Sequence, residues 1–546
     1  MKRERTKKNT QVMMMMQVAL RRLMLPLVAL LCFSSAASHP TFSGNKRIEK
    51  IVVHPQTGDV YVAAVNRIYL LSDSLVKQQE HVTGPKHSDG RCFPKAWNVP
   101  PENICDDSKA LTDFHNQLFL LNETSSVSSD TLVVCGSVVS GECNFYSAEN
   151  VSSILISAVE VLSKSSTVHV PVLVGTEATL STAAVIATAH GDSALYVATY
   201  RERSSLQLVT KPVMNVVSLE RSDLLKQLGS LDFTQWIGMG IESRPRQSFT
   251  SGQFVYFTSY QEDRTNTRAY RTVLSRICKD DSGLGSSSST LYGYMEATIK
   301  CQNSSHSFSF LTSQTIFNPG KALQTALNLS SSEDLLIALF AETYDKNTDI
   351  LNGDFAVCIY KMADIEQKFK ETQDKCRKGD SSIMKGFERD GTNTESCTDL
   401  TAIWNEQSCS PPDGTSVLLE VGSVILSQPA FIKRTFEITS VAVAVVGKST
   451  VAFFGTANGH LLKMILPDLT TVTEISNTLL TELTTSTEIH SLAFSLDNKY
   501  LFAVSESEVV KVPVETCSSL KSCDQCVASN DPFCGFCVLE NKFVSL

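Results

Sequence analysis

Long apolar runs and clusters of basic residues are both scarce in this sequence of 546 residues. Beyond the N-terminal segment, apolar runs are short, such as "VAVAVV" (Val441–Val446). A run of that length suits a strand and falls far short of the roughly 20 residues that a helix needs to cross a bilayer. The net charge is −9, and Lys and Arg form no long cluster after the N-terminus. Nucleic-acid binding therefore has no electrostatic support.

Several common sequence motifs of enzymes and of metal or cofactor sites are also missing. The chain contains no H-E-x-x-H, no G-x-S-x-G and no EF-hand loop. The segment "AVAVVGKST" (Ala442–Thr450) ends like a phosphate-binding loop, but Ala442 stands where that motif needs its first Gly. Strand-like sequences flank it on both sides, which predicts a hairpin that turns at Gly447–Ser449. We therefore expect no enzyme, no cofactor and no metal site.

The missing motifs alone do not exclude an enzyme, because catalytic triads assemble from residues far apart in a sequence. Two acidic pairs, Asp106/Asp107 and Asp280/Asp281, are expected on solvated loops. The ten histidines show no motif spacing, and four of them are candidates to meet in space: His115, His190, His306 and His490.

The N-terminus has the order of a secretory signal peptide. A basic segment is followed by the apolar run "LMLPLVALLCF" (Leu23–Phe33) and then by the small residues "SSAAS". We expect residues 1–38 to be this signal, with cleavage near Ala37 or Ser38. A mitochondrial presequence is the alternative, although the apolar run is continuous rather than amphipathic. The mature chain is thus expected to be secreted.

Cysteine is plentiful, and in an oxidising compartment cysteines are expected to pair. Of the sixteen cysteines, Cys32 lies in the signal segment, so an odd number remains. At least one is then unpaired, or the chain is incomplete. Spacing alone cannot pair the six cysteines from Cys278 to Cys409. Four N-x-[ST] sequons support the secretory interpretation and are candidate glycosylation sites: Asn122, Asn150, Asn303 and Asn328.

The segment "CSSLKSCDQCVASNDPFCGFC" (Cys517–Cys537) contains two C-x-x-C pairs. Two such pairs hold zinc in many proteins, mostly in reducing compartments. Behind a signal peptide, disulfides are the favoured interpretation.

Short segments rich in Val, Ile, Thr, Tyr and Phe, bounded by Gly, Asn, Asp and Ser, dominate the chain and predict antiparallel strands. They form about seven groups at intervals of roughly 60–70 residues, which suits a seven-bladed β-propeller with insertions. Two β-sandwiches are the alternative. "RIEKIVVHP" (Arg47–Pro55) is expected to complete the last blade and close the ring. One helix is predicted at Met362–Gly379, with Ile365, Phe369 and Thr372 on one face.

Several of these segments resemble the plexin family. "GDVYVAAVNRIYLLS" followed by "TGPKHSDGRC" is similar to the opening of a plexin sema domain, and "LTDFHNQLFLL" with "LVVCGSVVSGEC" to the segment after it. "VLSRIC" and "FFGTANGHLLKMIL" resemble further sema signatures, and "DPFCGFCVLE" resembles a PSI domain. The resemblance implies an all-β chain with a seven-bladed sema propeller at residues 39–515, followed by a small disulfide-rich PSI domain at 516–546.

The resemblance also implies cystine pairs. In the sema part they are Cys92–Cys105, Cys135–Cys143, Cys278–Cys409, Cys301–Cys358 and Cys376–Cys397, and in the PSI part Cys517–Cys534. Cys523, Cys526 and Cys537 have no family partners here, and Phe543 stands where the family tends to place another Cys. We therefore expect the PSI domain to be incomplete, with the sequence ending inside it.

Plexins are cell-surface receptors for semaphorins, so the resemblance implies a semaphorin-type protein ligand bound through the propeller, with homophilic sema–sema contact as a further option. Membrane attachment is expected only if a full-length chain continues to a transmembrane span. The alternatives are a semaphorin-type ligand, a soluble sema decoy and a scatter-factor-type receptor. No ligand-contact residue is identified at this point.

Overall fold

In the computed structural model, all described elements belong to one compact unit, Thr41–Leu546. The predicted signal segment and the residues Cys523 and Cys526 lie outside the described residues. The description covers residues 39–545 apart from 90–91, 96–99, 124–129, 158–172, 176–178, 201–213, 221–224, 232–242, 263–269, 287–290, 346–349, 381–396, 413–418, 434–436, 485–486, 516, 518–524, 526–527 and 538–541.

In the part of the chain that is described, six sheets of four strands and one of seven form seven blades. Blade 1 is β2 (Ile48–Val53), β3 (Val60–Ala64), β4 (Arg67–Leu71) and β5 (Lys77–Val82). Blade 2 is β8 (Asn116–Asn122), β9 (Thr131–Gly136), β10 (Cys143–Ser147) and β11 (Ile154–Ser157). Blade 3 is β12 (Thr182–Ala189), β13 (Asp192–Thr199), β14 (Met214–Ser218) and β15 (Gln227–Leu231). Blade 4 is β16 (Ser243–Ser251), β17 (Phe254–Glu262), β18 (Tyr270–Cys278) and β19 (Met295–Gln302), with the additional strands β20 (Ser307–Phe308), β24 (Leu419–Glu420) and β25 (Ile425–Ser427).

The remaining blades follow the same pattern. Blade 5 is β21 (Phe310–Phe317), β22 (Leu335–Asp345), β23 (Ile350–Lys361) and β26 (Pro429–Lys433). Blade 6 is β27 (Ile438–Val446), β28 (Ser449–Thr456), β29 (His460–Ile465) and β30 (Thr473–Leu479). Blade 7 is β31 (Ser491–Phe494), β32 (Tyr500–Val504), β33 (Glu508–Pro513) and β1 (Thr41–Ser43). The short elements outside the blades are β6 (Lys86–His87), β7 (Leu111–Thr112), η2 (Pro101–Asn103) and α4 (Lys321–Leu327).

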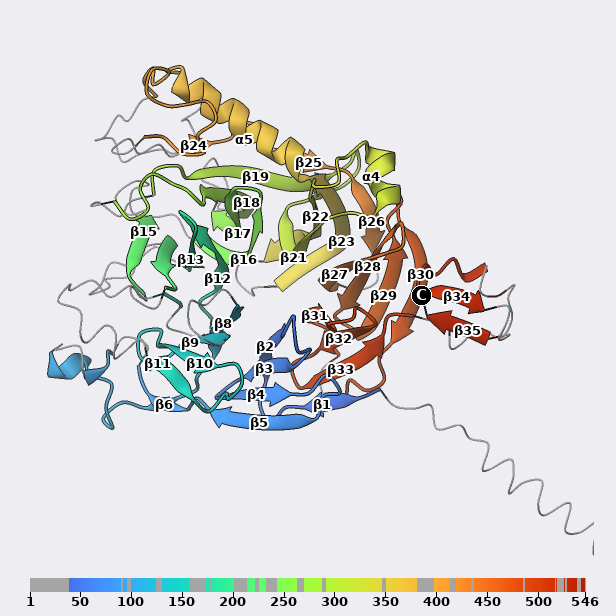
Figure 1. The fold of residues 1–546 in the computed structure, drawn as a ribbon, viewed down its shortest axis with the longest axis horizontal. Coiled ribbons are helices and arrows are strands. Elements are labelled where there is room, and N and C mark those ends of the chain that lie inside the picture. Colours follow the sequence, from blue (N-terminus) through green and yellow to red (C-terminus); the bar gives the residue numbers. More distant parts are fainter. Residues whose placement is uncertain are drawn as a thin grey trace, which may run out of the picture. The chain divides into compact units, whose positions relative to one another are not determined.

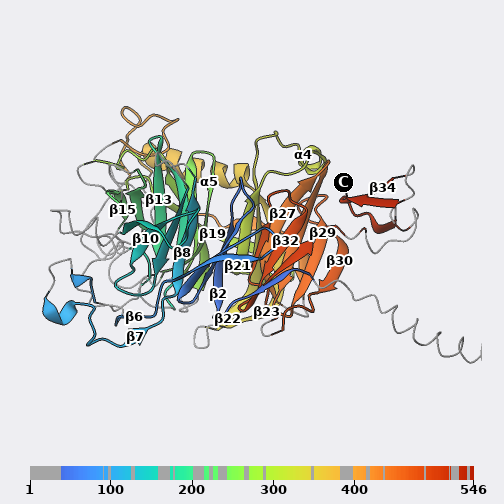
Figure 2. The same ribbon diagram turned by 60° about the horizontal axis from the view of Figure 1, so that its bottom comes forward.

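The blades form a ring. The first strand of each blade contacts the first strand of the next, from β2 through β8, β12, β16, β21 and β27 to β31, and β31 contacts β2. Figure 1 shows the blades around a common centre, and Figure 2 shows the same strands from a tilted direction. This arrangement is the predicted propeller rather than two β-sandwiches.

One strand differs from the prediction. "RIEKIVVHP" provides β2, the innermost strand of blade 1, and not the strand that completes the last blade. Blade 7 is completed by β1, which pairs antiparallel with β33. No sequence pattern marked β1, because it spans only Thr41–Ser43, whereas β2 has the longer Val- and Ile-rich pattern.

The core consists of layers between neighbouring blades. The middle strands are buried on both faces, as in β3, β9 and β14, because each blade is covered by the next on either side. One such layer joins blade 7 to blade 1 and includes Phe42, Val60, Tyr69 and Phe502. The ring is therefore closed by apolar packing as well as by the hydrogen bonds of β1.

The predicted helix is α5 (Met362–Arg377), and Ile365, Phe369 and Thr372 are all buried. Gly379 follows it with a φ of 84°, a left-handed conformation that favours Gly at a helix end. The helix belongs to a segment inserted between β23 and β26, which returns to pair β24 and β25 in parallel with β19 of blade 4. Figure 1 shows α5 along the outer side of β19.

"AVAVVGKST" forms the predicted hairpin. β27 and β28 flank a turn in which Gly447 has a φ of 58°. No helix follows the Lys448–Ser449 pair, so the segment lacks the strand–loop–helix geometry that a phosphate-binding loop requires.

The C-terminal segment contains the hairpin of β34 (Cys534–Cys537) and β35 (Lys542–Ser545). Within the described ranges, no helix has the length and apolar character needed to span a membrane.

Candidate functional site

Six disulfides join twelve cysteines in the described part of the chain. They are Cys92–Cys105, Cys135–Cys143, Cys278–Cys409, Cys301–Cys358, Cys376–Cys397 and Cys517–Cys534. These are the pairs that the resemblance implies. Three of them hold the α5 insertion and its neighbours, because they link β18, β19 and α5 to segments that lie 131, 57 and 21 residues further along the chain.

Arg276 fastens α5 to blade 4 in addition to these cystines. Its guanidinium carbon lies 4.0 Å from the centre of the Phe254 ring and 4.6 Å from that of Phe369 on α5. The guanidinium also forms an ion pair with Glu366 and donates to the side-chain oxygen of Gln373. Only 2% of Arg276 is exposed. A planar cation between two rings fixes the angle of the helix more strictly than a flexible ammonium group would.

The C-terminal cystine bears on the question of zinc. Glu515, Cys517 and Cys534 are close enough together to hold a cation. Cys517 and Cys534, however, are bonded to each other. A zinc site needs the free thiolates that this disulfide consumes, so the geometry favours the cystine.

The four candidate histidines lie on different blades and have different neighbours. His115 contacts Glu49 at 2.7 Å and His190 lies 3.8 Å from Asp280. His306 stacks on Phe308, and burial lowers the pKa of His490. The structure does not bring these four side chains together into one cluster.

Asp281 corrects a prediction. Asp106, Asp107 and Asp280 are exposed as expected, but Asp281 is completely buried. Its carboxylate accepts the backbone N–H groups of Gly283, Tyr292 and Gly293. It therefore organises a loop, because a buried carboxylate is stable where several donors surround it.

The sequons differ in accessibility. Asn150 and Asn328 are exposed, and Asn303 is partly exposed. Asn122, at the end of β8, has only 3% of its surface exposed. In the folded chain, Asn122 is therefore much less accessible to a glycan than the other three.

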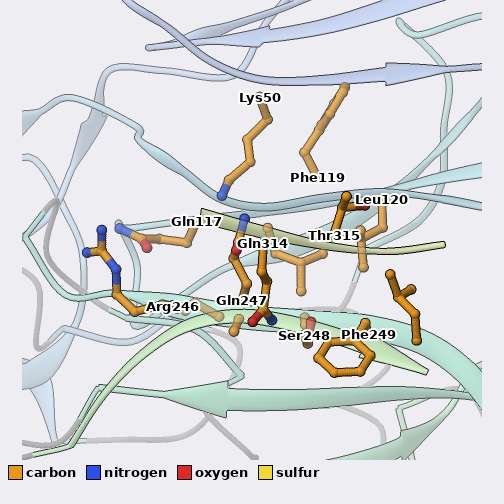
Figure 3. Close-up of a pocket in the computed structure, with 15 residues that line it drawn as sticks. Lys50, Gln117, Phe119, Leu120, Arg246, Gln247, Ser248, Phe249, Gln314 and Thr315 are labelled. Atoms are coloured by element: carbon orange, nitrogen blue, oxygen red, sulfur yellow. The ribbon is translucent and has the colours of Figure 1, made fainter. Parts of the chain in front are cut away.

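A cavity of about 390 Å³ lies at the centre of the ring, lined by the first strands of blades 1 to 5. Figure 3 shows a polar region on one side of it and an apolar region on the other. Polar lining comes from Lys50, Gln117, Arg246, Gln247 and Gln314, and apolar lining from Phe119, Leu120 and Phe249.

The two ionisable side chains that line this cavity, Lys50 and Arg246, are both basic. Burial lowers the pKa of Lys50, nearby Arg246 lowers it further, and Glu49 opposes the shift. Glu49 is itself occupied, since its carboxylate accepts the backbone N–H of Asn116 and contacts His115. This site could not be predicted from a local sequence pattern, because its side chains come from five separate strands that only the closed ring brings together.

Comparisons with known proteins agree with this architecture. The Sema domain family model matches residues 316–495. Plexin A3 of Danio rerio is 27% identical over 536 residues, which cover 90% of this chain and 26% of that protein. The solved plexin A4 full extracellular region superposes with a TM-score of 0.77 at 23% identity, over 93% of this chain and 50% of that chain.

The chain is similar to plexins over most of its length, and residues 316–495 match the Sema domain family model. A solved structure of Drosophila Plexin A in complex with Semaphorin 1b superposes with a TM-score of 0.58 at 16% identity, over 93% of this chain and 93% of that chain. At these identities the structural likeness establishes the fold of the sema domain alone. The chain spans about a quarter of the length of plexin A3, 26% of it.

Proposed function

We propose that this sema-domain chain is an extracellular protein-binding module of a plexin-like receptor, and that its partner is a semaphorin in cell–cell signalling or guidance. The observation that carries the proposal is the match to plexin A3 over 90% of the chain. The complex of Drosophila Plexin A with Semaphorin 1b supports the choice of partner class.

The proposal includes the expected layout of the chain. Residues 1–38 are the secretory signal, 39–515 the sema propeller and 516–546 the PSI segment. The six cystines are the native pairs, and Asn150, Asn303 and Asn328 carry glycans rather than the buried Asn122. The chain is secreted, or displayed on the outer side of the plasma membrane if it is part of a full-length receptor. Peptide mapping without reduction tests the pairing.

The outer strands of the blades supply surface for a protein partner. Large apolar side chains are exposed on three of them, namely Val82 on β5 at 55%, Ile154 on β11 at 47% and Leu479 on β30 at 51%. Exposed apolar residues on a protein surface are suited to contact with another protein. We propose a non-enzymatic binding module, because the candidate histidines lie apart and the conspicuous buried carboxylate, Asp281, is committed to backbone donors.

The test is a biosensor panel. The chain is expressed by secretion, its disulfides are verified, and it is immobilised beside a portion that has been reduced and alkylated. Semaphorin and plexin ectodomains from the same organism are passed over both surfaces. We expect saturable binding of at least one semaphorin to the folded surface and none to the alkylated one.

The panel also separates the alternatives. Binding of plexins without semaphorins would replace the receptor proposal by a semaphorin-type ligand. If no semaphorin binds to folded chain, the proposal is wrong. A soluble decoy is distinguished by adding the chain to semaphorin-responsive cells, where a decoy reduces the response in proportion to its concentration.

A further inference from the structure

β-Bulges mark the inner strands around the central cavity. A bulge places two residues opposite one on the partner strand and re-aims side chains, often beside functional sites. In the described residues, the first strands of blades 1, 2, 4, 5 and 6 each contain one. In each bulge, the extra residue is the one that the strand register skips. These residues are Glu49, Gln117, Arg246, Thr312 and Thr439.

Three of the bulge residues form side-chain hydrogen bonds to backbone groups in the next blade or directly before it. Glu49 accepts the backbone N–H of Asn116 of blade 2 at 2.6 Å. Thr312 donates to the backbone oxygen of Ile438 in blade 6 at 3.1 Å, and Thr439 donates to that of Ile489, before blade 7, at 2.7 Å. These side chains join neighbouring blades, which explains why the bulge recurs.

Arg246 does not take this role. Its guanidinium lies 5.2 Å from the centre of the Tyr260 ring, which belongs to its own blade. Within the described ranges, neither Arg246 nor Lys50 has a carboxylate at ion-pair distance. Arg246 is exposed and lines the cavity, so one cation is presented to a ligand that enters from solvent.

Gln314 adds an unsatisfied polar group. It is only 8% exposed, and neither of its amide atoms has a hydrogen-bond partner among the described residues. The side-chain oxygen of Gln247 in the same cavity is likewise buried without a partner. Buried polar atoms are normally hydrogen-bonded, so these groups are available to a guest in the cavity.

We propose that the central cavity binds a small organic anion, with its charged group between Lys50 and Arg246 and a hydrogen bond from the side-chain amide of Gln314. The apolar part of the ligand packs against Phe119 and Phe249 on the other side of the cavity (Figure 3). The anion stabilises two like charges that otherwise repel each other, and the volume of about 390 Å³ suits a small molecule.

Isothermal titration calorimetry on the folded, disulfide-bonded chain tests the site with three probes. Phenylacetate combines a carboxylate with a ring, benzylammonium has a similar shape with the opposite charge, and inorganic phosphate lacks an apolar part. We expect phenylacetate to bind and benzylammonium not to bind. Lys50→Met and Arg246→Gln should each weaken phenylacetate binding about tenfold, since each removes one charge-assisted contact.

Lys448→Met is the matched control, because Lys448 is exposed in the β27–β28 turn outside the cavity, and it should leave phenylacetate binding unchanged. The proposal is overturned if phenylacetate produces no heat, or if Lys50→Met and Arg246→Gln bind it as the unmodified chain does. Binding of phosphate alone would refute the apolar half of the site. Should Lys50→Met fail to fold, the exposed Arg246→Gln variant decides the matter.

Discussion

One buried ion pair fastens the C-terminal segment to blade 6. The Lys463 ammonium lies 2.6 Å from both carboxylate oxygens of Asp531 and also donates to the backbone oxygen of Val514. The side chains are 3% and 0% exposed. Lys463 also lies 4.5 Å from the centre of the Phe533 ring. The first cystine of the C-terminal segment is thus held next to a fully desolvated charge pair.

Removing one partner leaves the other charge buried without compensation. We expect Asp531→Asn and Lys463→Met each to lower the free energy of unfolding by about 3–5 kcal/mol. The double variant Lys463→Met/Asp531→Asn should lose less than the two single losses added together, because no charge remains buried. Urea denaturation with Lys448→Met as the control measures these differences. Simple additivity would show that the pair is not coupled.

Glu437 gives the fold a pH dependence at the residue scale. Burial, and then Glu488, raise its pKa from 4.5 to about 7, while Arg246 opposes the shift. Between pH 4.5 and about 7, the Glu437 carboxyl is protonated in the folded chain but ionised in the unfolded chain. Its contribution to stability is therefore fully present below pH 4.5 and is lost as the pH rises through about 7. The melting temperature should therefore fall with rising pH more steeply for the unmodified chain than for Glu437→Gln. Parallel curves for the two proteins would contradict this assignment.

The roles of some residues could be predicted from the sequence, and those of others could not. The spacing of Ile365, Phe369 and Thr372 predicted the buried face of α5, because residues on one face of a helix recur every three or four positions along the sequence. Asp281 looked like half of a solvated acidic pair, and its burial depends on a loop that delivers three backbone donors to it. Lys50, Arg246 and Gln314 are brought together only by the ring. Where strands far apart in the sequence determine what a side chain contacts, the local sequence pattern does not reveal that contact.

The strands were predicted more accurately than the blades to which they belong. Alternating apolar residues and turn residues predicted the strands and the hairpin of β27 and β28, where Gly447 turns with a φ of 58°. Assignment of β2 to the last blade was wrong, because β1 is too short to be recognised. The bulges were also missed, since one extra residue in a strand does not alter its composition.

The cystines should stabilise these elements unequally. The Cys301–Cys358 bridge closes 57 residues and links β19 to β23, whereas Cys135–Cys143 closes 8 within one hairpin. In the chain-entropy model the longer loop contributes about 2 kcal/mol more. All four cysteines are buried, so paired Cys→Ala variants are matched in burial. We expect a larger loss of unfolding free energy without Cys301–Cys358. An equal or reversed order in urea denaturation would contradict this.

The whole molecule depends on closing the ring between its first and last strands. Phe42 on β1 is 8% exposed and packs edge-on against Tyr69 of blade 1, with 5.1 Å between the ring centres. Through this contact the strand that completes blade 7 also covers blade 1. Closure joins residues more than 400 positions apart, such as Phe42 and Phe502, which a local pattern cannot specify.

Phe42→Ala should therefore lower the free energy of unfolding by about 3 kcal/mol, because it removes a buried ring from the closing layer. Ser43→Ala, at an exposed neighbouring position of the same strand, serves as the control and should have little effect. Thermal and urea unfolding measure both. If the two variants are equally stable, β1 is not essential to closing the ring.

At the scale of the whole molecule the central claim is that this propeller recognises a semaphorin. The most direct measurement is a biosensor titration of the folded, disulfide-verified chain with every semaphorin of the same organism. The proposal predicts saturable binding of at least one semaphorin, which is lost when the disulfides are reduced and alkylated. Absence of binding to the whole set, by chain shown to be folded, would contradict it.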